Sequence, residues 1–202
     1  LHPLTFQEFV GAVEGEGLAD VLEGYHIGAA IGGAVARRLE DATRHYLFVG
    51  GMPEAVQAYA DRAPLVDIQR IQSSIVGTME DDFAKYGSRA QQDLLRMALR
   101  HVARNVGRKI KFVNVSAERR AAEVRAALDL LAKGRVLHLV HHSSANGVPL
   151  GAEVNDKRFK AIFLDCGLAN RVYGLPVLPA GGLMTVNEGA LAEQFAGQEL
   201  RA

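Results

Sequence analysis

Cysteine, long apolar segments and net charge are scarce or absent in this chain of 202 residues. Its one cysteine, Cys166, cannot form an intramolecular disulfide, which fits a reducing cytoplasm. No apolar run approaches the roughly 18 residues that a membrane helix needs, so we expect no membrane partner. The first residues, LHPLTFQEF, lack the basic-then-apolar order of a signal peptide. The sequence therefore predicts a cytoplasmic protein.

A phosphate-binding loop is also missing. HYLFVGGMPEAVQAY, residues 45–59, places a glycine pair between an apolar run and a helix-forming segment, as at the start of a nucleotide site. A Walker loop needs Gly-Lys-Ser or Gly-Lys-Thr, because its lysine and hydroxyl hold phosphate and magnesium. GGMPEA offers neither group. We therefore expect no catalytic residue and no phosphate-cleaving site in this chain, and no cofactor bound by the chain alone.

The histidines and the cysteine give no metal or nucleophile site. On a strand, His138 and His142 share a face while His141 points the other way, and no further ligand has suitable spacing. Cys166 follows an apolar strand, which favours a small buried residue at the end of that strand. We expect Asp165 to cap the turn that follows rather than to act as an acid or base.

Local patterns predict a mostly α fold with a small β component. Thr5 and Glu8 have the spacing of a capping box, and Pro53 suits the first turn of a helix. Pro64 precedes an apolar stripe at helical spacing, formed by Leu65, Ile68, Ile71, Ile75, Met79 and Phe83. A helix is expected from Ser88 to about Val106, with Leu94, Leu95, Ala98, Leu99 and Val102 inward.

The next segments complete a recognisable order. Residues 109–115 are expected to be a connector, and a helix capped by Ser116 is expected to end at Gly134. Two strand-like runs follow, at 136–142 and 159–164. A winged helix-turn-helix has this order: a helix, a short helix or turn, a further helix and a hairpin. Such a unit binds DNA or serves only for packing.

We accordingly divide the chain into three predicted regions. Residues 1–86 form a helical lid-like region that carries GGMP, and residues 87–165 form a winged-helix-like region with a short hairpin. Residues 166–202 are expected to be a linker and the first helix of a truncated C-terminal domain.

Basic residues gather in the second region. Between Arg100 and Arg125 there are eight Lys or Arg against Glu118 and Glu123, a local charge of +6 in a neutral chain. The candidate nucleic-acid contacts are Arg108, Lys109, Lys111, Arg119, Arg120 and Arg125. These residues also fit an ordinary solvated surface, on which Arg119 and Glu123 would pair one helical turn apart.

Five segments together indicate a family. They are PLTFQEF, YLFVGGMPEAV, MEDDFAKYG, SSANGVPLGAEVNDKRFKAIFLDCGLANRVYG and GALAEQFAGQEL, which extend over essentially the whole chain. In this order they resemble the C-terminal portion of predicted AAA+ superfamily ATPases of bacteria and archaea, which carry a C-terminal domain of unknown function. The resemblance implies partners outside this chain, namely an ATPase core that binds ATP with magnesium and a nuclease-like domain. Glu193 or Glu199 would match an acid on the opening helix of that domain.

The resemblance also gives the glycine pair a role. A Gly-x-Pro motif of related ATPases touches the bound nucleotide, so Gly50, Gly51 and Pro53 are candidate nucleotide-sensing residues. A tight interhelical turn is the alternative.

The expected function is therefore that of one part of an ATP-dependent switch, which senses the nucleotide and relays its state without catalysis by this chain. Two alternatives remain open. One is a DNA-binding winged-helix module, and the other is a protein-interaction domain of a toxin–antitoxin or defence-type system.

Overall fold

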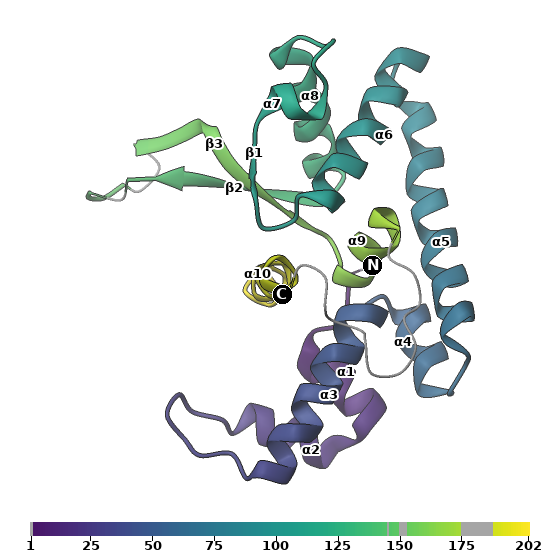
Figure 1. The fold of residues 1–202 in the computed structure, drawn as a ribbon, viewed down its shortest axis with the longest axis vertical. Helices are drawn as coiled ribbons and strands as arrows, with labels where there is room; N and C mark the ends of the chain where they lie inside the picture. Colours follow the sequence, from purple (N-terminus) through teal and green to yellow (C-terminus); the bar gives the residue numbers. More distant parts are fainter. Residues whose placement is uncertain (1, 145, 150–152, 175–187) are drawn as a thin grey trace.

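The computed structural model describes residues 2–144, 146–149, 153–174 and 188–202. It is mostly helical with a small antiparallel sheet, which confirms the predicted fold class. The longer helices in the first half are α1 (Phe6–Glu14), α2 (Glu16–Glu23), α3 (Gly33–Val49), α4 (Pro53–Ala60) and α5 (Leu65–Asp82), with a 3-10 turn at Phe83–Lys85. We call residues 1–88 the helical body. Figure 1 shows α1 to α4 gathered at one end of the molecule, with α5 running along its side.

The second half holds the sheet. In chain order it contains α6 (Arg89–Arg104), β1 (Lys109–Ile110), α7 (Phe112–Val115), α8 (Ala121–Lys133), β2 (Leu137–Ser143) and β3 (Val154–Phe163). We call residues 89–163 the α6–β3 unit. Its strands are antiparallel in the order β1-β3-β2, and the β2–β3 hairpin extends away from the helices in Figure 1. Two more helices follow, α9 (Cys166–Tyr173) and α10 (Glu188–Glu199).

The predicted helix starts in the helical body are confirmed. The hydroxyl of Thr5 accepts a hydrogen bond from the Glu8 amide at 3.2 Å, and the Glu8 carboxylate accepts from the Thr5 amide at 2.7 Å. Pro53 occupies the first position of α4, where its missing N–H costs no hydrogen bond. Gln72 of α5 is buried, and its side-chain amide donates hydrogen bonds to the carbonyl oxygens of Phe48 and Val49 at the end of α3.

The start of α8 differs from its prediction. The helix begins at Ala121, and Ser116 is instead a buried residue that ends α7. The Glu123 carboxylate accepts a hydrogen bond from the Arg120 amide at 3.0 Å, so an acid inside the first turn fixes the helix start. The expected connector at 109–115 also forms structure of its own, a two-residue strand and the short α7.

Helix α9 was not predicted at all. The side chain of Asp165 caps it by accepting from the Leu168 amide at 2.8 Å, where the sequence had suggested only a capped turn. Four residues of α9 are buried, Cys166, Gly167, Leu168 and Ala169. The helix packs against α3, α5 and α6, so it ties the helical body to the α6–β3 unit.

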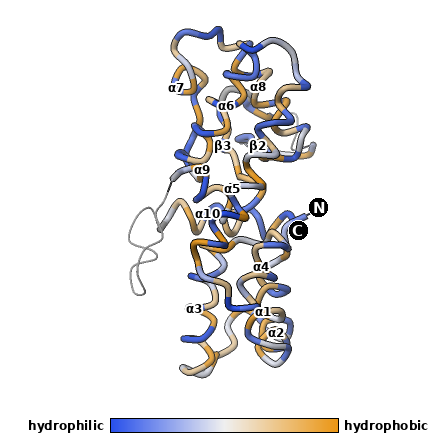
Figure 2. The backbone as a smooth tube through the Cα atoms, turned by 90° about the vertical axis from the view of Figure 1, so that its right-hand side faces the viewer, coloured by the Kyte–Doolittle hydropathy of each residue, from blue (hydrophilic) through white to orange (hydrophobic). Residues whose placement is uncertain are grey.

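One hydrophobic cluster runs through both parts. It extends from Phe9 and Tyr46 in the body to Leu99 and Leu128 in the α6–β3 unit, and it includes Leu168 of α9. Figure 2 shows α10 crossing the middle of the elongated molecule, between these two parts. None of the described helices combines the length and apolar character required to cross a membrane.

Candidate functional site

The glycine pair lies inside the protein, at the turn between α3 and α4. Gly50 ends α3 with a φ of 76°, in the left-handed region that other residues rarely adopt. A Cβ on Gly50 would overlap the carboxylate of Asp165, and one on Gly51 would overlap the carbonyl oxygen of Leu4. The pair therefore permits a close approach between three segments that are distant in the sequence.

Asp165 holds this turn in place. Its buried carboxylate accepts hydrogen bonds from the amides of Gly51 at 2.6 Å and Leu168 at 2.8 Å. Burial raises the pKa of Asp165 to about 6, and hydrogen bonds from backbone amides limit the rise. Gly167 completes the contact, because a Cβ there would overlap the carbonyl oxygen of Val49. The Gly51 amide is thus already bound to a carboxylate within the chain.

Two glutamines of α10 form buried hydrogen bonds, one with β3 and the other with α9 and α3. The side-chain amide of Gln194 accepts from the Phe163 amide and donates to the Phe163 carbonyl, both at 2.8 Å. Gln198 accepts from the Cys166 amide at 2.9 Å and donates to the Tyr46 hydroxyl at 2.8 Å. α10 is therefore attached to β3, α9 and α3 through specific buried hydrogen bonds as well as apolar packing.

The two glutamates singled out by the family resemblance also have partners within the chain. The carboxylate of Glu199 accepts from the Phe6 amide at 3.0 Å and lies 3.1 Å from the Tyr46 hydroxyl. Burial raises the pKa of Glu199. Glu193 forms an ion pair with Lys160 of β3. In this chain both acids join α10 to other elements.

Cys166 is buried, as the sequence suggested, but it begins α9 rather than ending a strand. Its Sγ lies 3.3 Å from the carbonyl oxygen of Tyr46. Burial raises the pKa of the thiol, which disfavours the reactive thiolate.

A cavity of about 530 Å³ lies beside Pro53. Its lining includes the exposed side chains of His2, Glu8 and Arg201 and, from β2, His138. Among the described residues His138 Nε2 is buried without a hydrogen-bond partner. The glycine pair is not on the cavity wall, so the structure separates Pro53 from the two glycines that the sequence grouped with it.

Charge is distributed very unevenly between the parts of the molecule. The α6–β3 unit contains fifteen Lys and Arg against six Asp and Glu, a net charge of +9. The remainder of the neutral chain therefore carries −9. This imbalance is larger than the +6 found between Arg100 and Arg125 alone, because the unit also includes the start of α6, the end of α8 and the hairpin.

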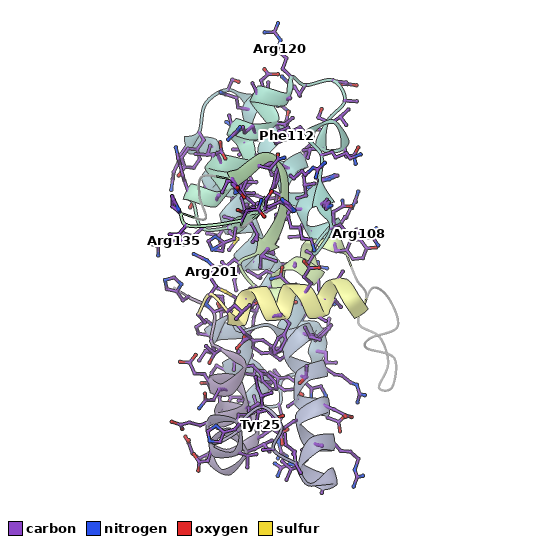
Figure 3. The ribbon with its side chains drawn as sticks, turned by 90° about the vertical axis from the view of Figure 1, so that its left-hand side faces the viewer. Tyr25, Arg108, Phe112, Arg120, Arg135 and Arg201 are labelled. Atoms are coloured by element: carbon purple, nitrogen blue, oxygen red, sulfur yellow. The ribbon has the colours of Figure 1, made fainter. Side chains whose placement is uncertain are left out.

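The six basic residues predicted to contact nucleic acid are all exposed, and they come from three places. Arg108, Lys109 and Lys111 lie at or beside β1, Arg119 and Arg120 precede α8, and Arg125 lies on α8. Figure 3 shows Arg120 at the end of the molecule farthest from the helical body and Arg108 lower down on its flank. Arg120 and Arg108 lie well apart in this view, so the set does not form one compact patch.

Four further exposed cations among the described residues of the unit lie outside the window in which charge had been counted: Arg89, Lys133, Arg135 and Arg158. Arg89 begins α6, Lys133 ends α8, Arg135 follows α8 and Arg158 lies on β3. Counting over the whole predicted winged-helix region would have found them.

Comparisons with known proteins add a family to this geometry. A family model described as Domain of unknown function (DUF8612) matches residues 40–178. No curated protein and no solved structure matches the chain.

Proposed function

The chain belongs to the family Domain of unknown function (DUF8612), and we propose that residues 89–163 bind duplex DNA as a winged helix-turn-helix. The element order supports this proposal: α6, β1, α7 and α8 precede the β2–β3 hairpin. Winged helix-turn-helix proteins share this order and place the third helix in the major groove. By that analogy α8 is the groove helix and the hairpin is the wing.

The observation that carries the proposal is the charge of +9 on this unit within a neutral chain. DNA presents about one negative charge per 1.7 Å of helix axis, so clustered Lys and Arg bind it by displacing counterions. The acidic remainder of the chain would be repelled by DNA. Topology and charge thus both favour the α6–β3 unit as the part of the molecule that would bind a polyanionic partner.

Titration of the whole chain against a short labelled DNA duplex at several salt concentrations tests the proposal. We expect clear binding at ~50 mM salt and a loss of affinity by a factor of at least ~10 at ~200 mM, because phosphate contacts release counterions. Absence of binding at the lower salt concentration would contradict the proposal.

A matched pair of variants locates the contact. Replacing Arg119, Arg120 and Arg125 with alanine should weaken DNA binding by at least ~10-fold at low salt and reduce the salt dependence. The control replaces three exposed arginines of α3, Arg37, Arg38 and Arg44. The control removes the same total charge from the helical body, so it should change the affinity by less than ~2-fold if the contact is local.

The protein-interaction alternative predicts a different result for the same variants. Capture of one defined protein partner by the wild-type chain, retained by the triple-alanine variant and unaffected by added DNA, would favour that class over DNA binding.

Contact with a nucleotide through Pro53 is a second candidate function. Its support is the cavity of about 530 Å³ beside the start of α4, which Pro53 lines together with the cation Arg201. Ligand sites are commonly clefts of roughly 300–1,000 Å³ with a few polar groups on an apolar wall. The nucleotide would be the ATP that the family resemblance implies for a longer protein with an ATPase core.

Pro53→Gly in that longer protein tests this function. We expect nucleotide binding to weaken by roughly 10-fold, because glycine loosens the start of the helix that faces the cavity. Pro64→Gly is the matched control, since Pro64 also precedes a helix, is exposed and lies away from the cavity lining. Equal nucleotide affinity in the wild type and both variants would contradict this function and would mean that GGMP serves only as a turn between helices.

A further inference from the structure

We infer that the α6–β3 unit binds duplex DNA without selecting a base sequence. It would recognise the phosphates and the shape of the duplex. The inference rests on the function proposed above and defines its ligand class as any B-form duplex. Reading a base sequence requires side chains that present donors or acceptors to the base edges in a groove, whereas phosphate contacts carry no sequence information.

The surface of α8 offers few such side chains. Ala121, Ala122 and Ala126 are exposed, and an alanine side chain can touch a thymine methyl group but cannot form a hydrogen bond. The helix also contains no Asn or Gln, which are the usual readers of adenine. Small side chains would let the helix backbone approach a groove closely while leaving the base sequence unread.

The charges of α8 itself cancel. Arg125 and Lys133 are balanced by Glu123 and Asp129, although the whole unit carries +9. Arg125 Nε lies 3.9 Å from the Asp129 carboxylate, and Glu123 is engaged with the Arg120 amide. Arg125 is thus the one hydrogen-bonding cation in the middle of the helix, and an acid one turn away competes with any base. The excess positive charge has to act from outside α8.

That excess lies on segments beside or before the helix. Arg108, Lys109 and Lys111 are exposed at β1, on the opposite edge of the sheet from β2. Arg119 precedes α8 and lines a small cavity between α6 and α8. Arg120 extends from the far end in Figure 3. Cations placed around a neutral helix suit the two phosphate backbones that border a groove.

The expected selectivity is correspondingly small. Proteins that read sequence bind their sites roughly 10³- to 10⁷-fold more tightly than other DNA. Arg125 is the only cation in the middle of α8, and the acid beside it, Asp129, lies 3.9 Å from it, so we expect unrelated duplexes to differ in affinity by less than ~10-fold.

Binding of the whole chain to equal-length duplexes of A·T-rich, G·C-rich and mixed sequence tests this inference, together with selection from a random duplex library. Dissociation constants within ~10-fold of each other at one salt concentration, and no motif after selection, are the expected results. A larger preference or a recovered motif overturns the inference and leaves the proposed function standing. Absence of binding to every duplex at low salt overturns both.

Two single variants separate phosphate contact from base reading. Arg125→Ala should weaken binding to every duplex by the same factor, roughly 3- to 10-fold, and Asp129→Asn should strengthen binding to every duplex by removing a negative charge. Both side chains are about half exposed, so the fold should survive, which circular dichroism can verify. A loss of affinity after Arg125→Ala that is confined to one sequence would show base reading and contradict the inference.

Discussion

The helical body and the α6–β3 unit are similar in length and opposite in charge. Residues 1–88 contain six Lys and Arg against thirteen Asp and Glu, a net charge of −7, whereas residues 89–163 carry +9. Such neighbours would be expected to attract one another. Yet the pairs from Glu80 of α5 to Arg96 and Arg100 of α6 are long, at 3.9 and 3.7 Å, and each lies partly in solvent.

Shorter contacts made by α9 and α10 also link the two regions. Gly50 and Gly167 bring backbones together around the buried carboxylate of Asp165, and the amide of Gln194 holds the last residue of β3. Contacts of this kind have a short range and depend little on salt, whereas exposed ion pairs contribute about 0–1 kcal/mol. The two regions can therefore keep opposite surface charges for use with other molecules.

The largest expected effect comes from adding one methyl group at the contact between α9 and the α3–α4 turn. Gly167→Ala would force a Cβ into the Val49 carbonyl oxygen, a backbone atom that cannot move aside. We expect a loss of more than ~3 kcal/mol in the free energy of unfolding, measured by urea denaturation.

Gly17→Ala is the control for that variant. Gly17 lies inside α2 and has open space where a Cβ would lie, so alanine should stabilise the protein by ~0.5–1 kcal/mol. Similar stability of both variants would show that the contact between α9 and the α3–α4 turn is loose.

Truncating the buried glutamine of α10 should have the next largest effect. Gln194→Ala leaves both the amide and the carbonyl of Phe163 without the partner they have now, and we expect a cost of about 3 kcal/mol. Gln57→Ala removes an exposed glutamine from α4 and should cost less than ~0.5 kcal/mol. A small loss for Gln194→Ala would mean that α10 is attached mainly by apolar packing.

Asp165 makes the contact between α9 and the α3–α4 turn depend on pH. Its pKa of about 6 exceeds the ordinary value of 3.8 for an aspartate, so the folded protein binds this proton more tightly than the unfolded chain. The resulting stabilisation is complete below about pH 4 and is lost as the pH rises through about 6. Relative to Asp165→Asn, the wild type should lose on the order of 2 kcal/mol of unfolding free energy between ~pH 4 and ~pH 7. Parallel pH profiles for the two proteins would contradict this expectation.

The smallest expected effect is that of the visible ion pairs. Glu80→Gln removes the acid shared by Arg96 and Arg100, and we expect a loss of less than ~1 kcal/mol that disappears at ~1 M salt. A loss above ~2 kcal/mol would mean that charge attraction, and not the glycine and amide contacts, holds the two regions together.

Helices and strands whose formation depends on residues close together in the chain could be predicted from the sequence. The N-cap Ser88, the apolar face of α6 and the position of Pro53 are properties of neighbouring residues, and each is found as expected. The hairpin was also expected, although β3 begins earlier, at Val154.

Contacts between distant residues could not be predicted. Gly51 and Asp165 are 114 positions apart, and no pattern around either residue indicates the other. α9 was missed for another reason: its cap, the bond from the Leu168 amide to Asp165, is local, but the pattern was interpreted as a turn and not as the start of a helix. The candidate DNA-binding residues were found through local charge, but the neutrality of α8 became visible only once its true start at Ala121 was known.

The hydrogen bonds between Gln194 and Phe163 have a consequence for self-association. β1 covers β3 only at Phe159 and Lys160, so the edge of β3 beyond that pair has no neighbouring strand on this side among the residues that the structure describes. An open strand edge is a template on which other chains can pair and aggregate. The glutamine side chain occupies the backbone donor and acceptor at the end of that edge, as a strand would, and α10 packs on the same strand. Displacement of α10 would therefore leave this edge of β3 open to pairing with another chain.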